Sequence, residues 1–153
     1  AAVASGGVYW WMTPKQADPA VMKKFLEEKA REDGVVKLPS GLMYKVLEEG
    51  HGTEHPRPNA PCRCHYRGAL VTGEEFDSSY KRGGASVFNP GQVIKGWSEA
   101  LQLMVEGDKW ELYVPAALAY GDKGSGSMIH GGAALVFEVK LVEIVGGRVP
   151  RKR

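Results

Sequence analysis

The chain has 153 residues, a net charge of +2, 43% apolar residues and 25% charged residues. This composition is close to that of an average globular protein and excludes collagen, a coiled coil and wholesale disorder. No run approaches the ~18 consecutive apolar residues of a membrane-spanning helix, and two cysteines are too few for a disulfide scaffold.

The positive charge collects at the carboxyl end. Residues 148–153 contain four basic residues and no acid, so the rest of the chain is slightly acidic. A nucleic-acid-binding domain usually carries its basic residues on the folded face, and we therefore expect no nucleic-acid partner. The segment is interpreted as a solvated tail, with weak adhesion to an anionic surface as the alternative.

The first 14 residues carry no charge, and their apolar residues cluster at positions 8–12. We expect Trp10 and Trp11 to pack on the domain, with a membrane face or a partner contact as alternatives. The Ala-rich start, which does not begin with Met, suggests a processed, exported chain or a trimmed product.

A helix is predicted over residues 19–33. Asp18 is a good N-cap, Pro19 suits the first helical position, and Gly34 is a stop signal. The apolar residues recur at spacings of three and four, which places them on one face. That face must pack on the body of the protein or on a second chain; its residues are Val21, Met22, Phe25, Leu26 and Ala30.

Strand patterns dominate after this helix. β-branched and aromatic residues between turn signals predict strands at 42–48, 62–71, 109–114 and 133–145, with a Pro-rich loop at 52–61. Between 91 and 105 the helical spacing returns, with Trp97, Leu101 and Met104 on one side. The natural assembly is an α+β domain in which one antiparallel sheet packs on one short helix.

Most catalytic chemistry lacks support in this sequence. Phosphate-binding glycine motifs and a G-x-S-x-G nucleophile elbow are absent. His51 and His55 lie in a Pro/Gly segment, and His65 is interpreted as a packed or hydrogen-bonded strand residue. Cys62 and Cys64 lie on one strand face, where a mutual disulfide has poor geometry. We expect no metal and no cofactor, so an enzyme built on this chain must work by binding and shape.

Aromatic and apolar residues recur beside turns that contain glycine, and singly each is typical of a core. Three details favour a binding site instead. Asp77 directly follows Phe76, Trp97 opens the second predicted helix, and Tyr120 stands at a loop entrance. Together these residues suit an apolar ligand that has one polar edge. The indole can form a floor under the ligand, while the acid and the hydroxyl can hydrogen-bond to its polar groups.

Five short motifs occur in order along the chain. They are His65-Tyr66-Arg67-Gly68, Phe76-Asp77-Ser78-Ser79, Gly91-Gln92-Val93-Ile94-Lys95-Gly96-Trp97, Ala119-Tyr120-Gly121 and Leu135-Val136-Phe137-Glu138-Val139. With them the chain resembles, from about residue 41 to residue 144, the FKBP family of peptidyl-prolyl cis/trans isomerases, which bind tacrolimus and rapamycin. The helix ahead of this region further resembles the macrophage infectivity potentiator (Mip) subgroup.

The resemblance implies a strongly bent antiparallel sheet wrapped around a short helix, with the pocket between them. Trp97 would form the pocket floor, Ile94 would offer its backbone N–H to a ligand carbonyl, and Tyr120 would offer its hydroxyl. Asp77 would hold a polar contact at the edge. The implied catalytic residues are thus Asp77, Tyr120 and Trp97, and the implied ligand-binding residues are Tyr66, Phe76, Val93, Ile94, Ile129 and Phe137.

The implied reaction is cis/trans isomerisation of Xaa-Pro bonds. The planar peptide bond has a rotation barrier of ~18–20 kcal/mol, and the uncatalysed exchange takes tens to hundreds of seconds. The twisted transition state loses resonance and its charge separation, so an apolar pocket should favour it over the planar amide. No covalent intermediate or proton donor is needed.

Three departures from the family pattern affect the pocket walls. The segment between Ser79 and Gly91 is short, and a second Phe wall expected there is replaced by Ala85. A family His aligns with Ser125, and the familiar prolines after Ile129 are replaced by residues 130–132. These walls determine which substrate residue is preferred before proline, and they determine the affinity for macrolides.

Two other functions stay open on the same scaffold. One is a binding module that engages a partner without isomerising it. The other is a chaperone-like protein that works through its helix and aromatic leader. The expected domains are a leader and helix at 1–34, an isomerase domain at 35–147 and a basic tail at 148–153.

The resemblance implies proline-containing peptides and proteins, together with macrolide inhibitors, as partners. It also implies assistance to protein folding and an interaction with a host. We expect a monomer that is secreted or exported, with the cytoplasm as the alternative location.

Overall fold

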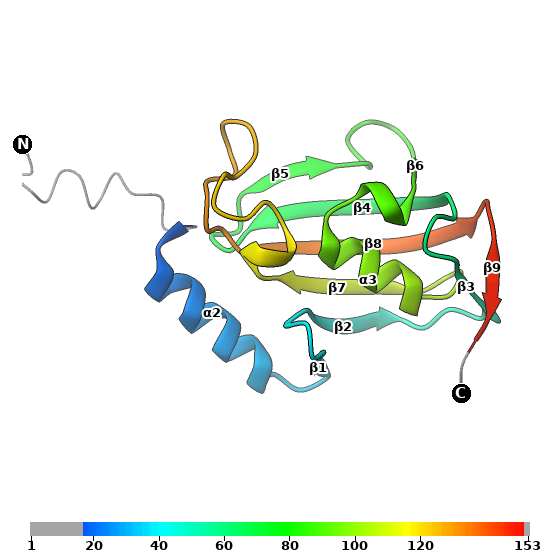
Figure 1. The fold of residues 1–153 in the computed structure, drawn as a ribbon, viewed down its shortest axis with the longest axis horizontal. Helices are drawn as coiled ribbons and strands as arrows, with labels where there is room; N and C mark the ends of the chain where they lie inside the picture. Colours follow the sequence, from blue (N-terminus) through cyan, green and yellow to red (C-terminus); the bar gives the residue numbers. More distant parts are fainter. Residues whose placement is uncertain (1–16, 152–153) are drawn as a thin grey trace, which may run out of the picture.

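The computed structural model describes residues 17–151, so the aromatic pair at positions 10 and 11 and the last two basic residues lie outside it. Figure 1 shows a curved sheet with the helix α3 lying against one face and a second helix, α2, at the amino-terminal end. The elements in chain order are α2 (Pro19–Arg31), β1 (Val35–Lys37), β2 (Met43–Glu48), β3 (Glu54–Pro56), β4 (Cys62–Leu70), β5 (Glu75–Ser78), β6 (Ser86–Phe88), η3 (Pro90–Gln92), α3 (Lys95–Leu103), β7 (Lys109–Val114), η4 (Ala116–Leu118), β8 (Leu135–Ile144) and β9 (Arg148–Pro150).

All strand pairs are antiparallel. The main sheet has the order β1-β2-β7-β8-β4-β5, and β6 pairs with β4 beside β5. The strands β3 and β9 form a separate two-stranded sheet. The predicted α+β class, with an antiparallel sheet around a short helix and a helix ahead of it, is confirmed.

The core lies between the sheet and α3. On β4 the residues Cys62, Cys64 and Tyr66 are buried, while Arg63 between the cysteines and Arg67 after Tyr66 are exposed, which confirms the predicted alternation. The helix α3 buries Trp97, Ala100 and Leu101 against this face. Both cysteines are free, and burial raises the pKa of Cys62 to about 11.

The helix α2 packs on the opposite face of the sheet. Alternation along β7 sends Leu112 into the core and Tyr113 to the other side, where Phe25 meets Tyr113 edge to face at 6.3 Å between ring centroids. Met22 is buried, and its Sδ accepts a hydrogen bond from the Ala134 N–H at 3.2 Å. The apolar stripe of α2 thus packs on this chain's own domain.

The start of α2 follows the prediction, and its end differs. The Asp18 carboxylate accepts a hydrogen bond from the Ala20 N–H at 2.9 Å, as expected of an N-cap. The helix ends at Arg31, earlier than predicted, because Glu32 is already extended and Gly34 turns the chain with φ of +85°.

Two predicted segments contain more structure than expected. The Pro-rich loop at 52–61 includes β3, which pairs with β9. The basic tail predicted from residue 148 begins with β9, where Arg148 lies 3.2 Å from Glu106. Among residues 17–151, no helix is long and apolar enough to cross a membrane.

Candidate active site

A hollow of about 310 Å³ lies between the amino-terminal turn of α3 and the sheet. It holds every residue that the sequence indicated for the site except Ile129, and it adds Phe88 and Gln92. The lining residues are Tyr66, Phe76, Asp77, Phe88, Gln92, Val93, Ile94, Trp97, Tyr120 and Phe137.

The indole of Trp97 lies at the centre of an aromatic frame. It is only 4% exposed, and it meets Tyr66, Phe88 and Phe137 edge to face at 5.2, 5.1 and 5.5 Å between ring centroids. Edge-to-face pairs at such distances are favourable beyond the area that they bury. Because α3 begins at Lys95, the first turn of the helix fixes the ring as a floor.

The far wall depends on a glycine. Phe76 and Phe137 meet edge to face at 5.7 Å, and both rings lie against Gly68 of β4. A Cβ atom at Gly68 would come within 2.7 Å of Phe76 and 2.8 Å of Phe137. The two rings can therefore take these positions only because residue 68 has no side chain.

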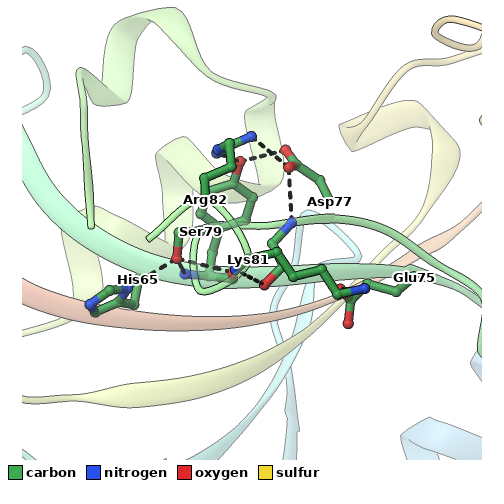
Figure 2. A network of polar contacts seen from close by, with 8 residues as sticks. His65, Glu75, Asp77, Ser79, Lys81 and Arg82 are labelled. Atoms are coloured by element: carbon green, nitrogen blue, oxygen red, sulfur yellow. Dashed lines mark hydrogen bonds and ion pairs between the residues drawn. The ribbon is translucent and has the colours of Figure 1, made fainter. Parts of the chain in front are cut away.

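The polar edge of the hollow is a three-residue network. The Tyr66 hydroxyl donates to the Asp77 carboxylate, and Arg82 donates to both the carboxylate and the hydroxyl oxygen. Figure 2 shows Arg82 reaching Asp77 from the loop after β5. Burial, and then the bond to Asp77, raise the pKa of Tyr66, so the hydroxyl stays protonated. Arg82 was not predicted, because its place in the network depends on how that loop folds back.

A second network behind the first holds the backbone of Tyr66. The Tyr66 N–H donates to the Ser79 hydroxyl at 2.8 Å, and a ring nitrogen of His65 lies 3.1 Å from the same oxygen. The His65 ring stacks on Tyr80 at 4.6 Å. Figure 2 shows His65, on β4, in contact with Ser79, which directly follows β5. The interpretation of His65 as a packed, hydrogen-bonded residue is confirmed.

Phe88 corrects the wall expected from the sequence. We expected Ala85 in place of a second Phe wall, but the wall is aromatic: Phe88, at the end of β6, lies 5.4 Å from Tyr66 and 5.1 Å from Trp97 between ring centroids. Ala85 is not among the lining residues. The sequence signal for Phe88 was weak because β6 is only three residues long.

Ile129 lies outside the hollow. It is 7% exposed and belongs to the core cluster, where a bridge pairs it with Ser125. Tyr120, by contrast, is 38% exposed and stands at the mouth. Of this loop, Tyr120 at its start lines the hollow, while Ile129 near its far end packs in the core.

His55 of the Pro-rich segment lies outside the hollow around Trp97. A ring nitrogen of His55 lies 2.9 Å from the Met104 carbonyl oxygen. Within residues 17–151, the structure holds no group of three or more His, Cys, Asp or Glu side chains arranged to bind a metal ion.

This arrangement defines a class of protein. An aromatic slot with a hydrogen-bonding edge binds an apolar ring and orients a neighbouring carbonyl, and none of the described Ser, Cys, Lys or His residues lines the slot. The class is a non-covalent binder of apolar, carbonyl-bearing ligands on a bent antiparallel sheet.

Comparison with known sequences gives the family. Residues 52–142 match the model of the FKBP-type peptidyl-prolyl cis-trans isomerases. Residues 13–46 match the domain amino terminal to FKBP-type peptidyl-prolyl isomerases. The chain belongs to the FKBP-type peptidyl-prolyl cis-trans isomerase family.

Individual relatives agree with this assignment. The chain is 47% identical over 127 residues to the macrophage infectivity potentiator of Trypanosoma cruzi, covering 83% of this chain and 65% of that protein. It is 42% identical over 120 residues to the outer membrane protein MIP of Legionella longbeachae, covering 78% of this chain and 51% of that protein. The chain thus spans less than two thirds of either relative.

A solved structure matches at nearly full length. The crystal structure of a peptidyl-prolyl cis-trans isomerase from Pseudomonas syringae pv. tomato superposes with a TM-score of 0.79 at 33% identity. The match covers 87% of this chain and 97% of that one. The described fold is therefore that of the FKBP family.

Proposed function

We propose that this chain catalyses cis/trans isomerisation of Xaa-Pro peptide bonds. The observation that carries the proposal is the aromatic frame around Trp97, closed on one side by the Tyr66–Asp77 bond. A proline ring fits an apolar floor of this kind, and the polar edge lies where the adjoining peptide group would be.

The proposed mechanism is differential stabilisation of the twisted amide. A planar amide is polarised by resonance and is well solvated in water, whereas the twisted amide has lost much of that polarisation. A hollow walled by Phe76, Phe88 and Phe137 excludes water, so it favours the twisted form over the planar form. This route uses no nucleophile and no proton transfer.

Three groups would orient the substrate. The Ile94 backbone N–H would bind the carbonyl that follows proline, and the Tyr120 hydroxyl at the mouth would hold a second carbonyl. Asp77 would make the polar contact at the edge, and its two partners, Tyr66 and Arg82, would keep the carboxylate in place. Tyr66 and Arg82 are thus positioning residues for Asp77.

The test is the isomerisation rate of a short Xaa-Pro peptide with the full chain and with Trp97→Leu. The unchanged chain should accelerate the exchange well above the spontaneous rate. Trp97→Leu should lose most of the acceleration, because the floor is gone, while circular dichroism shows a folded domain. A folded, unchanged chain without any acceleration would reject the proposal.

Macrolide binding is part of the proposal. The hollow offers the apolar floor and the carbonyl partners that a tacrolimus-type ligand requires, and Phe88 restores an aromatic wall on the β6 side. Suppression of isomerisation by tacrolimus would support this point. Unaltered turnover in a large excess of the drug would reject it.

The remaining assignments concern the whole protein. We propose that it assists the folding of proline-containing proteins and that it is secreted or exported, supported by the name of the Legionella longbeachae relative as an outer membrane protein. An interaction with a host is proposed from the name of the Trypanosoma cruzi relative.

We also propose that the protein is a monomer, which is supported by the packing of Phe25 on Tyr113 of the same chain. The division at residues 34 and 147 stays a prediction.

A further inference from the structure

A second and larger hollow lies at the other end of α3. Its volume is about 680 Å³, and we name it the apolar basin. Its floor is a stacked aromatic pair, Tyr44 and Trp110, with ring centroids 4.0 Å apart and planes within 8°. Leu103 and Val46 line it and are 41% and 45% exposed. The other apolar side chains of the basin are Leu38, Pro56, Pro58, Val149 and Pro150.

Three polar side chains of the basin, Asp108, Gln102 and His55, have partners inside the protein, and the lining also includes Glu49 and Arg151. Asp108 accepts hydrogen bonds from the Gly50 and Val105 N–H groups at 2.7 and 3.0 Å. The Gln102 amide donates to the Ser98 carbonyl oxygen at 3.0 Å. A ligand that covers the basin would leave these hydrogen bonds in place, and most of the energy of binding would come from apolar contact with Tyr44, Val46 and Leu103.

The basin and the hollow around Trp97 lie at opposite ends of the same helix, α3. A shallow groove lies along the helix and is lined by Lys95, Ser98, Glu99, Gln102, Leu103 and Leu118. At the basin end it shares Gln102 and Leu103 with the basin. At the other end Lys95 follows Ile94 of the hollow. The helix has nine residues and so spans about 13 Å, which an extended peptide covers in about four residues.

We propose that the apolar basin is a docking site for the polypeptide substrate itself. It takes an aromatic or large aliphatic side chain located about four to six residues from the proline that occupies the hollow. The proposal rests on the proposed isomerase function and names its substrate class: extended, unfolded chains with an apolar residue at that separation. The exposed Leu103 and Val46, beside an aromatic floor, are the surface that such a side chain covers.

The physical consequence is a preference for long substrates over short peptides. Covering apolar surface stabilises a complex by about 25 cal/mol per Å², and each half-exposed side chain of the basin contributes a few tens of Å². Because the basin is outside the hollow, this energy holds the substrate without changing the chemistry of the twisted bond. The advantage is thus expected in KM, with kcat nearly constant.

The experiment uses the full chain and four peptides with the same Xaa-Pro core. One is short, two carry a Phe five residues before or after the proline, and the fourth carries Ser at both positions. Isomerisation kinetics and a fluorescence-anisotropy titration are measured for each. We expect a roughly tenfold lower KM and Kd for one Phe peptide than for the Ser peptide.

Matched variants locate the effect. The double variant Val46→Thr/Leu103→Gln keeps size and local propensity but makes the basin polar, and it should abolish the Phe advantage while the short peptide turns over normally. Leu47→Gln is the control, because Leu47 is 41% exposed on the same strand and lies outside the basin. It should keep the advantage.

The outcomes separate the two proposals. Equal KM for Phe and Ser peptides, or an advantage that survives in the double variant, overturns the docking site even when short peptides are isomerised. If no peptide is isomerised but a Phe peptide has a lower Kd than the Ser peptide, and the double variant abolishes that difference, docking is supported and the isomerase function is rejected. Absence of both rejects both.

Discussion

Phe76 and Phe137 meet edge to face over Gly68, with ring centroids 5.7 Å apart and planes at 88°. The two rings come from β5 and β8, on either side of β4. Because residue 68 has no side chain, the two rings can lie against β4, and their positions determine the width of the hollow.

Gly68→Ala should narrow the hollow. The added methyl would lie under 3 Å from both rings, so the rings must move toward Trp97 or the strands must separate. Overpacking of this kind costs about 1–3 kcal/mol of unfolding free energy, and we expect peptide turnover to fall as well. Urea unfolding and isomerisation kinetics measure the two effects. Gly84→Ala is the control, since an added Cβ there meets nothing within 4 Å; equal effects of both changes would contradict the account.

The polar network of Tyr66, Asp77 and Arg82 predicts losses of isomerase activity that differ in size between its members. Asp77→Asn removes the charge that Arg82 and Tyr66 hold in place, and a charge-assisted hydrogen bond contributes about 1.5–3 kcal/mol, so kcat/KM should fall roughly tenfold or more. Tyr66→Phe leaves Asp77 paired with Arg82 and should cost less. Stopped-flow kinetics on a short peptide gives both values. The role of Asp77 would be rejected if its variant turned over normally.

The environment of Tyr66 also predicts how the isomerisation rate changes as the pH becomes alkaline. Its pKa is raised above the usual value of 10 by burial and by Asp77, so the hydroxyl keeps its proton where a free tyrosine would lose it. Isomerisation should stay constant up to about pH 10 and should not decline earlier. A decline near pH 9 that disappears in Tyr66→Phe would show that Tyr66 ionises more easily than this environment allows.

The parts of the fold that were predictable carry strong local signals. The start of α2 was correct because Asp18 and Pro19 are specific capping residues. The strand β4 was correct because every second one of its nine residues is buried. Such signals come from the backbone and its nearest neighbours, and they need no knowledge of the tertiary structure.

The parts that were missed depend on distant contacts. The short strands β3 and β9 have three residues each and exist because they pair with each other across the chain. Phe88 enters the hollow only because β6 pairs with β4, and Arg82 reaches Asp77 by a folded-back loop. Ile129 was assigned to the pocket by family resemblance, whereas bonds to Ser125 hold it in the core.

The buried cysteines predict protection from alkylation. Burial raises the pKa of Cys62 to about 11 and raises that of Cys64 further, and both side chains are 0% exposed. The reactive form is the thiolate, so labelling by iodoacetamide at pH 8 should be negligible in the native chain and complete in denaturant. Mass spectrometry follows the reaction. Rapid labelling of either thiol under native conditions would contradict the described core.

Glu106 predicts a loss of stability in acid. Its carboxylate accepts hydrogen bonds from the Ile144 N–H at 2.7 Å and from Arg148 at 3.2 Å. The Ile144 bond and then Arg148 lower its pKa below the usual 4.5. A lowered pKa contributes stability above the unfolded value, and that contribution is lost as pH falls through the folded value.

The test is urea unfolding between pH 6 and pH 3. Glu106→Gln should be less stable than the unchanged chain at pH 6, and the difference should shrink below about pH 4.5. Glu28→Gln, at an exposed position of α2, is the control and should follow the unchanged chain. A difference for Glu106→Gln that is constant with pH would mean that the carboxylate charge contributes nothing.

The central claim is that the hollow around Trp97 isomerises prolyl bonds. The most direct measurement is the exchange rate of a short Xaa-Pro peptide with the full chain, by NMR exchange spectroscopy, with and without excess tacrolimus. The account predicts an acceleration that the drug suppresses. A folded chain that leaves the spontaneous rate unchanged would contradict it.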